Sequence, residues 1–71
     1  MPVVKLNAPA ARAIREKTGL SVSETAKRLG VSQGQVSNWE AGRRQPTEQN
    51  LLALAGLLAV SLAAITIPDA A

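Results

Sequence analysis

The stretch that decides the fold is residues 21–40, which read SVSETAKRLGVSQGQVSNWE. Within it, Ser21 is followed three positions later by Glu24, and Ser32 is followed three positions later by Gln35. This spacing is that of a capping box, in which the hydroxyl and the second side chain accept hydrogen bonds from each other's backbone N–H groups at a helix start. The stretch therefore predicts two short helices, one directly after the other.

The segment between these two helices has the residues of a helix-turn-helix unit. Gly30 stands where a tight turn needs a positive φ angle, and the small Ala26 stands where two crossing helices must come close. Apolar residues that can hold the second helix at a fixed angle are Leu29, Val31, Val36 and Trp39. Thr25 departs from the pattern, because an aliphatic side chain is expected there. The combined pattern predicts a helix-turn-helix.

Capping and turn residues predict three more helices around this unit. The first starts at Asn7 or Ala8 and ends at Gly19, the fourth starts at Pro46-Thr47, and a short fifth runs from Ser61 to Ile65. Val3–Leu6 and Ile65–Ile67 could pair as strands, but both runs are too short to predict a sheet. The expected fold is therefore all-α, a compact five-helix bundle.

The composition removes most enzyme chemistry. The 71 residues include no Cys, His or Tyr, which excludes disulfides, thiolate zinc sites and most acid/base or nucleophilic catalysis. We therefore expect no enzymatic activity, no metal and no cofactor. Trp39 is the single aromatic residue, and one aromatic is more typical of a core than of a platform for stacking bases.

Charge is distributed unevenly along the chain. Residues 1–44 hold all eight Lys and Arg residues and three acidic ones, a net charge of +5, whereas residues 45–71 hold two acidic residues and no basic one. This asymmetry favours a polyanionic partner. The apolar run 51–67 approaches the length of a membrane span, but Gly56 and Ser61 interrupt it and no Lys or Arg flanks it. We expect no membrane partner and, without a leader-like start, a cytoplasmic protein.

Several motifs occur in a fixed order along the chain. They are Arg12-Ala13-Ile14-Arg15-Glu16, Gly19-Leu20-Ser21, Ala26-Lys27-Arg28-Leu29-Gly30-Val31-Ser32, Val36-Ser37-Asn38-Trp39-Glu40-Ala41-Gly42-Arg43-Arg44-Gln45-Pro46-Thr47 and Leu51-Leu52-Ala53-Leu54-Ala55. In this order and spacing the chain resembles the Cro/C1-type (XRE) helix-turn-helix domains of phage repressors. The resemblance implies a lambda-repressor-like DNA-binding domain, expected at residues 9–66, with an N-terminal arm at 1–8 and a C-terminal tail at 67–71.

The resemblance also implies which side chains contact double-stranded DNA. In this geometry the third helix enters the major groove, and residues near its start contact base edges. The matching base-contact positions are Gln33, Gly34, Ser37 and Asn38, and the expected phosphate contacts are Ser32, Gln35, Arg43 and Arg44. The amides of Gln33 and Asn38 each offer a donor and an acceptor that match N7 and N6 of adenine. Helix capping alone explains Ser32 and Gln35 equally well.

Further roles follow from the same resemblance. Arg15 and Glu40 match a pair that forms a salt bridge between the first and third helices. Val22 stands where the family commonly has a Gln that contacts phosphate, and a valine side chain cannot donate that hydrogen bond. The expected structural residues of the unit are Arg15, Ala26, Gly30, Trp39 and Glu40.

The C-terminal third carries more apolar surface than a core of this size readily buries. The residues expected at an interface are Leu52, Leu57, Leu62, Ile65 and Ile67. They predict a homodimer, which would place two recognition helices about one DNA turn apart on a near-palindromic operator. The alternative, that these side chains cover the core of a monomer, stays open.

The sequence thus predicts a sequence-specific, double-stranded DNA-binding transcriptional regulator of the Cro or repressor kind. The alternative is a protein-interaction module, such as an antitoxin or an adaptor, that keeps the helix-turn-helix shape and binds a non-identical protein. A third hypothesis, a membrane-associated peptide, requires residues 51–67 to form one unbroken helix.

Overall fold

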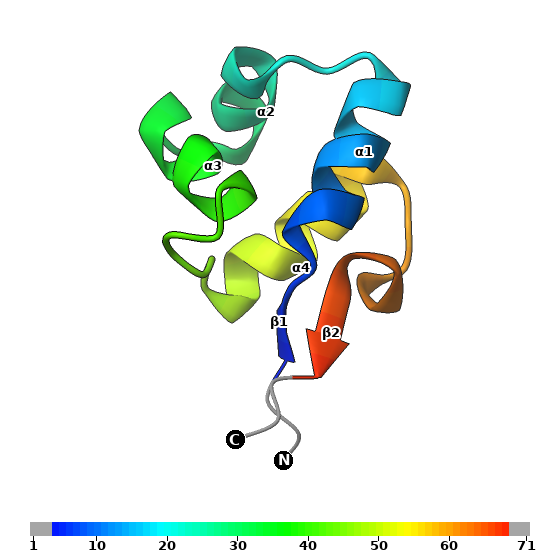
Figure 1. Cartoon of the computed structure of the whole chain (residues 1–71). Helices are drawn as coiled ribbons and strands as arrows, with labels where there is room; N and C mark the ends of the chain where they lie inside the picture. Colours follow the sequence, from blue (N-terminus) through cyan, green and yellow to red (C-terminus); the bar gives the residue numbers. More distant parts are fainter. Residues whose placement is uncertain (1–3, 69–71) are drawn as a thin grey trace.

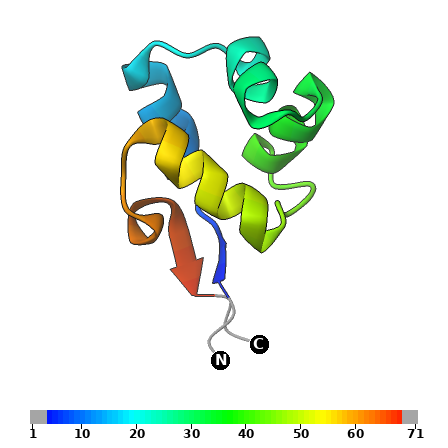
Figure 2. The ribbon, with the colours of Figure 1, turned by 180° about the vertical axis from the view of Figure 1, so that it is seen from behind.

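The computed structural model describes residues 4–68, which form four α-helices, one short 3-10 helix and two strands. In chain order the elements are β1 (Val4–Leu6), α1 (Ala8–Thr18), α2 (Val22–Leu29), α3 (Gln33–Glu40), α4 (Glu48–Leu58), the 3-10 helix η1 (Leu62–Ile65) and β2 (Thr66–Pro68). Figure 1 and the view from behind in Figure 2 show the α-helices grouped together, with the two strands side by side at one end of the molecule.

The prediction of an all-α, five-helix bundle is wrong in two respects. The fifth helix is a 3-10 helix of four residues, and its expected cap Ser61 makes no side-chain hydrogen bond to it. The two strands pair antiparallel in the register Val4↔Pro68, Lys5↔Ile67 and Leu6↔Thr66. Beyond the strands, the N–H of Asn7 donates to the carbonyl of Ile65 at 2.7 Å. The expected arm and tail therefore both contribute to the fold, although residues 1–3 and 69–71 lie outside the described part.

Each α-helix begins at a polar side chain that accepts a backbone hydrogen bond from three residues further on. These caps are Asn7, Ser21, Ser32 and Thr47. A complete capping box forms at α3, but the box expected at α2 forms only by half. The half that is missing is the contact of the Glu24 side chain with the backbone of Ser21. The carboxylate of Glu24 instead lies 3.4 Å from Nε of Arg28, a charged partner one helical turn ahead.

All four α-helices end in the same hydrogen-bond pattern. The chain leaves them through a residue in the left-handed conformation, which is Gly19, Gly30, Gly42 or Ala59. The N–H of that residue donates three residues back and the next N–H donates five residues back, as in a Schellman motif. Ala59 differs in residue type: its φ angle is +57°, where the Cβ of an L-residue crowds the following carbonyl oxygen.

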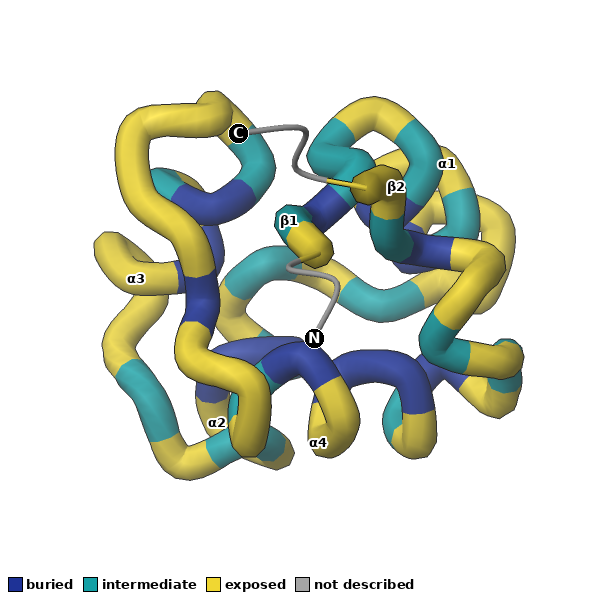
Figure 3. The backbone as a smooth tube through the Cα atoms, turned by 90° about the horizontal axis from the view of Figure 1, so that it is seen from below, coloured by how far each residue is buried: buried dark blue, intermediate teal, exposed yellow. Residues whose placement is uncertain are grey.

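The core lies where the helices face one another. Its buried apolar residues are Leu6, Ala11, Ala26, Val36, Trp39, Leu51, Leu54, Ala55, Leu58 and Ile65. In Figure 3 the buried positions recur at intervals along the helices, as expected where one face points inward. Thr25, the unexpected residue of the turn unit, is completely buried, and its hydroxyl has no hydrogen-bond partner within residues 4–68.

Residues 51–67 do not form the one unbroken helix that the hypothesis of a membrane-associated peptide requires. α4 ends at Leu58, the backbone of Ala59 turns the chain, and η1 begins only at Leu62. In the part of the chain that the structure describes, no helix combines the length and the apolar character needed to cross a membrane.

Candidate nucleic-acid interface

α3 presents its predicted recognition face to solvent. Val36 and Trp39 are buried on its other side, and the helix packs against α2 and α1. Of the four predicted base-contact residues, three are exposed, namely Gln33, Gly34 and Ser37. The fourth, Asn38, is half-buried. The helix is therefore held from behind while its polar face stays free.

An ion pair between Arg15 and Glu40 fixes α3 against α1. Nε and Nη2 of Arg15 donate to the two carboxylate oxygens at 2.6 Å and 3.0 Å, and Nη1 donates to the carbonyl of Leu20 at 2.7 Å. The two side chains are only 9% and 13% exposed. The hydrogen bond to Glu40 raises the pKa of Arg15 above its usual value, against the opposing effect of burial. The predicted salt bridge is confirmed.

The start of α3 uses Ser32 and Gln35 for capping. Oγ of Ser32 accepts from the N–H of Gln35 at 3.1 Å, and Oε1 of Gln35 accepts from the N–H of Ser32 at 2.9 Å. Because this oxygen is occupied, the amide nitrogen is the group of Gln35 that can still meet a ligand, and it is a donor. Capping is confirmed for both residues, whereas their contact with phosphate stays a prediction.

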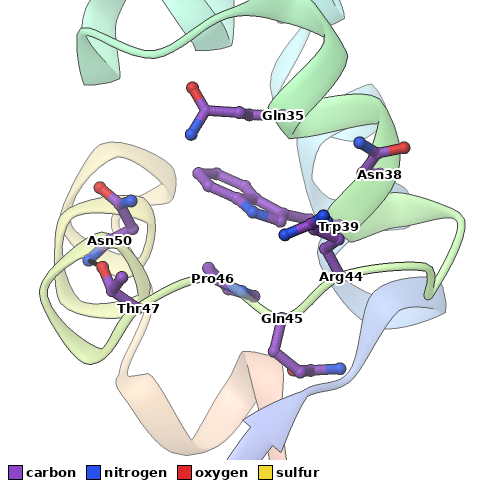
Figure 4. A pocket seen from close by; sticks show the side chains of 8 residues that line it. All are labelled: Gln35, Asn38, Trp39, Arg44, Gln45, Pro46, Thr47 and Asn50. Carbon is purple, nitrogen blue, oxygen red and sulfur yellow. Dashed lines mark hydrogen bonds between the residues drawn. The ribbon is translucent and has the colours of Figure 1, made fainter.

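A hollow of about 160 Å³ lies beside α3, over the indole ring of Trp39. Its lining residues are Gln35, Asn38, Trp39, Arg44, Gln45, Pro46, Thr47 and Asn50. In Figure 4 the amide nitrogen of Gln35 points into the hollow, whereas Gln45 points away from it. Oε1 of Gln45 accepts from the N–H of Leu6 at 2.9 Å, which ties this loop to β1. With the nitrogen of Gln35 and the guanidinium of Arg44 on its walls, the hollow suits an oxyanion.

The basic loop after α3 bends back onto Asn38. The backbone N–H groups of Arg43 and Arg44 donate to the carbonyl of Asn38 at 2.9 Å and 3.4 Å. Nη1 of Arg43 also donates to Oδ1 of Asn38 at 3.1 Å. From the sequence, Asn38 is expected at a base and Arg43 at a phosphate, and their mutual contact is not predicted. The sequence feature that could have predicted this contact is Gly42. A glycine there favours a Schellman turn, and such a turn places the next residue, Arg43, beside Asn38.

A second hollow, of about 280 Å³, lies on another side of α3. Its lining residues are Arg12, Arg15, Val22, Ser37, Glu40, Ala41 and Arg43. Val22 packs against the core, so it contributes an apolar wall and no side-chain donor to this hollow. The guanidiniums of Arg12 and Arg43 are the sources of positive charge on this hollow that do not lie in the buried pair with Glu40.

The residues predicted for a dimer interface do not all reach the surface. Leu52 is 53% exposed and Ile67 is 37% exposed, whereas Leu57 and Leu62 are half-buried. Ile65 is completely buried, so the expectation that it contacts a second subunit is wrong. Its burial follows from the packing of η1 against both α1 and α4, which turns this side chain into the core.

The family model described as Helix-turn-helix matches residues 12–65 of this chain. Among solved structures, the DNA-binding domain of the P22 c2 repressor is similar at 34% identity and a TM-score of 0.76, over 83% of this chain and 78% of that one. The same repressor in complex with a synthetic operator gives 34% and 0.75, over 82% and 88% of the two chains.

Two further similar structures are of regulators. SinR, the master regulator for biofilm formation, solved in complex with DNA, is 27% identical with a TM-score of 0.74, over 82% of this chain and 94% of that one. The clp gene regulator ClgR from Corynebacterium glutamicum is 30% identical with a TM-score of 0.75, over 79% of this chain. The match spans only 60% of the ClgR chain. No curated protein matches the sequence.

Proposed function

Because this chain belongs to the helix-turn-helix family of the Cro/C1 (XRE) type, we propose that it is a DNA-binding transcriptional regulator that reads the major groove with α3. The observation that carries the proposal is the two-sided character of α3, where Gln33 and Ser37 are exposed and Trp39 is buried behind them. A helix held in this way can enter the groove without leaving the core. The similar SinR and P22 c2 structures contain DNA, which supports a duplex as the partner.

Base recognition is assigned first to Gln33. This side chain is exposed in the first turn of α3, where it can present both its amide donor and its amide acceptor. The pair matches N7 and N6 of adenine in the major groove. Gly34, beside it, adds no side chain and instead lets the backbone approach the neighbouring base pair. Ser37 lies one helical turn further and can meet either kind of base.

Contacts to the DNA backbone are assigned to donors around the two hollows. The nitrogen of Gln35 and the guanidinium of Arg44 line the first hollow, and Arg43 lines the second. Ser32 lies at the start of the same helix. Every basic residue of the chain lies within residues 1–44, so positive charge is concentrated on the part that carries α3. Such contacts set the affinity and its dependence on salt.

A homodimer would bring two copies of α3 to one operator. Leu52 on α4 and Ile67 on β2 are exposed, and exposed apolar side chains of this size favour an interface. Leu57 and Leu62 are half-buried and can extend the same surface, whereas Ile65 cannot. Two-fold symmetry of the protein would then be matched by a near-palindromic site with half-sites about 34 Å apart. A monomer in which Leu57 and Leu62 only cover the core is the alternative.

A protein-interaction module, such as an antitoxin or an adaptor, is the second candidate. The same exposed Leu52 and Ile67 would then bind a non-identical protein. The exposed Arg43 and Arg44 beside the polar face of α3 favour the DNA-binding function instead, because a polyanion is their natural partner.

A protein that acts on DNA in this way is a binding protein rather than an enzyme, and in a bacterium its place of action is the cytoplasm or nucleoid.

Selection of bound sequences from a random duplex pool at a fixed salt concentration tests the proposed function. The expected result is one half-site, repeated with two-fold symmetry. Gln33→Ala should then weaken binding to the selected duplex by about 1–3 kcal/mol and leave binding to a scrambled duplex unchanged. Gln49→Ala, the same change at an exposed position of α4, should alter neither. A protein that binds no duplex in a salt-dependent manner would contradict the proposal and favour the interaction module.

A further inference from the structure

The side chains of Asn38 and Arg43 form a hydrogen bond that changes what Asn38 can recognise. Nη1 of Arg43 donates to Oδ1 of Asn38 at 3.1 Å. A guanidinium has only donors, so the oxygen of the amide must face Arg43 and its nitrogen must face away. In Figure 4, which does not draw Arg43, the nitrogen and the oxygen of the Asn38 amide point in different directions, with the nitrogen on the side of Trp39.

The backbone already holds these two residues together. Gly42, with a φ angle of +75°, turns the chain after α3, and the N–H of Arg43 donates to the carbonyl of Asn38 at 2.9 Å. Asn38 is also half-buried, which limits its rotamers. Since the main chains are in place, forming the side-chain contact requires mainly the ordering of Arg43, which reduces its entropic cost.

This contact disfavours the adenine recognition expected from the sequence. An Asn reads adenine when its oxygen accepts from N6 and its nitrogen donates to N7. At Asn38, the guanidinium of Arg43 already donates to one of the two lone pairs of that oxygen, so the amino group of adenine would have to approach beside a cation and its N–H groups. Guanine instead offers two acceptors, N7 and O6. The nitrogen of Asn38 and the remaining N–H groups of Arg43 are all donors and match them.

We propose that Arg43 sets the base preference of Asn38. By binding the amide oxygen, Arg43 surrounds the acceptor of Asn38 with N–H donors, so that the pair selects guanine over adenine at one position of the operator. The inference rests on the proposed DNA-binding function and deepens it, because it gives Arg43 a role in sequence choice in addition to its expected contact with phosphate.

Three variants in the random-pool selection test this inference. Asn38→Ala should abolish the preference at one half-site position and so identify it. At that position the wild type should select guanine. Arg43→Ala should shift the selection toward adenine, changing the ratio of the Kd values for two duplexes that differ only there by about fivefold or more. Arg44→Ala removes the same charge from a residue that meets Asn38 through its backbone N–H, and should weaken both duplexes with the guanine preference kept.

The outcomes separate this inference from the function on which it rests. A guanine preference that persists in Arg43→Ala would overturn it, as would a wild type that selects adenine at the position identified by Asn38→Ala. An Asn38→Ala variant with an unchanged selected site would also overturn it, since Asn38 would then read no base. In each of these cases DNA binding itself stands. A wild type that binds no duplex would refute the DNA-binding function, and this inference with it.

Discussion

Gly56 occupies a backbone position that suits alanine, and Ala59 occupies one that suits glycine. At the end of α4 the N–H of Ala59 donates to the carbonyl of Gly56 at 3.2 Å. Gly56 lies inside the helix, where an added Cβ would meet no atom within 4 Å, whereas Ala59 has the left-handed φ angle of +57°. Glycine destabilises a helix interior and is the residue that adopts left-handed backbone most readily. Both residues therefore weaken the end of α4.

Exchanging these two residues should stabilise the domain. Gly56→Ala should raise the free energy of unfolding by about 0.5–1 kcal/mol. Ala59→Gly should raise it by roughly 0.5 kcal/mol, because the strain that is removed exceeds the entropy that glycine adds to the unfolded chain. Urea unfolding followed by circular dichroism measures both, and the double variant keeps the composition unchanged. A Gly56→Ala variant that is less stable would show that a second subunit covers this face of α4.

Replacing Thr25 by valine should also stabilise the protein. The hydroxyl of Thr25 is buried and has no hydrogen-bond partner in the described residues. Thr25→Val keeps the shape and removes this group, so we expect a gain of about 1 kcal/mol in the free energy of unfolding. Thr25→Ser is the control: it keeps the hydroxyl, removes a buried methyl group and should lower stability by about 1 kcal/mol. A destabilised Thr25→Val variant would mean that a buried water satisfies the hydroxyl.

Removing one partner of the ion pair between Arg15 and Glu40 should be strongly destabilising. Glu40→Ala leaves a nearly buried guanidinium whose remaining bond is to the carbonyl of Leu20, at a cost of about 3 kcal/mol or more. Arg15→Met combined with Glu40→Leu should lose much less, since it leaves no buried charge. Thermal unfolding of the three proteins is the measurement. Equal losses in the single and double variants would argue that packing, rather than charge, decides stability here.

The pH dependence of this pair follows from the raised pKa of Arg15. A group whose pKa is higher in the folded state contributes stability that is fully present below its unfolded pKa and is lost as the pH rises through the folded value. For Arg15 that window lies in strong alkali, because the hydrogen bond to Glu40 raises a pKa that is already high. Between about pH 6 and about pH 9 the protonation of Arg15 should therefore contribute no change to the free energy of unfolding. Chemical unfolding at several pH values in this range is the measurement.

Arg44 should contribute to affinity without contributing to sequence choice. Arg44→Ala removes an exposed charge from the wall of the hollow over Trp39, so specific and scrambled duplexes should be bound more weakly by similar factors. The slope of log Kd against log salt should fall by about one. Lys17→Ala, the same loss of charge at the end of α1, is the control. An unchanged slope for Arg44→Ala would remove Arg44 from the phosphate contacts.

Leu52 should decide the oligomeric state if α4 forms the dimer interface. Leu52→Glu places a charge at the most exposed large apolar side chain of the described residues, and burial of that charge would oppose association. Sedimentation velocity should show a dimer for the wild type and a monomer for the variant. Operator affinity should fall with loss of the second half-site. A wild type that sediments as a monomer at all concentrations would contradict the proposed interface.

Local chemistry made the α-helices and the recognition face predictable. Asn7 and Ser32 cap their helices as expected, and Gly19 and Gly30 end theirs, because each signal involves groups within about five residues of one another. The exposed side of α3 followed from the apolar spacing of its other side, with Trp39 in the core. The ion pair of Arg15 with Glu40 was reached only through resemblance, since no local rule joins residues on separate helices.

The sequence by itself determined where the four α-helices begin and where the first three end, the helix-turn-helix unit, and the concentration of positive charge in residues 1–44. Only the tertiary structure decided the pairing of Lys5 with Ile67, the burial of Ile65 and the contact of Arg43 with Asn38. The physical reason is range. Caps and turns satisfy backbone groups a few residues away, so the local sequence predicts them. Strand pairing and burial depend instead on which surfaces the packed helices bring together, and the residues next to a position in the sequence do not determine that.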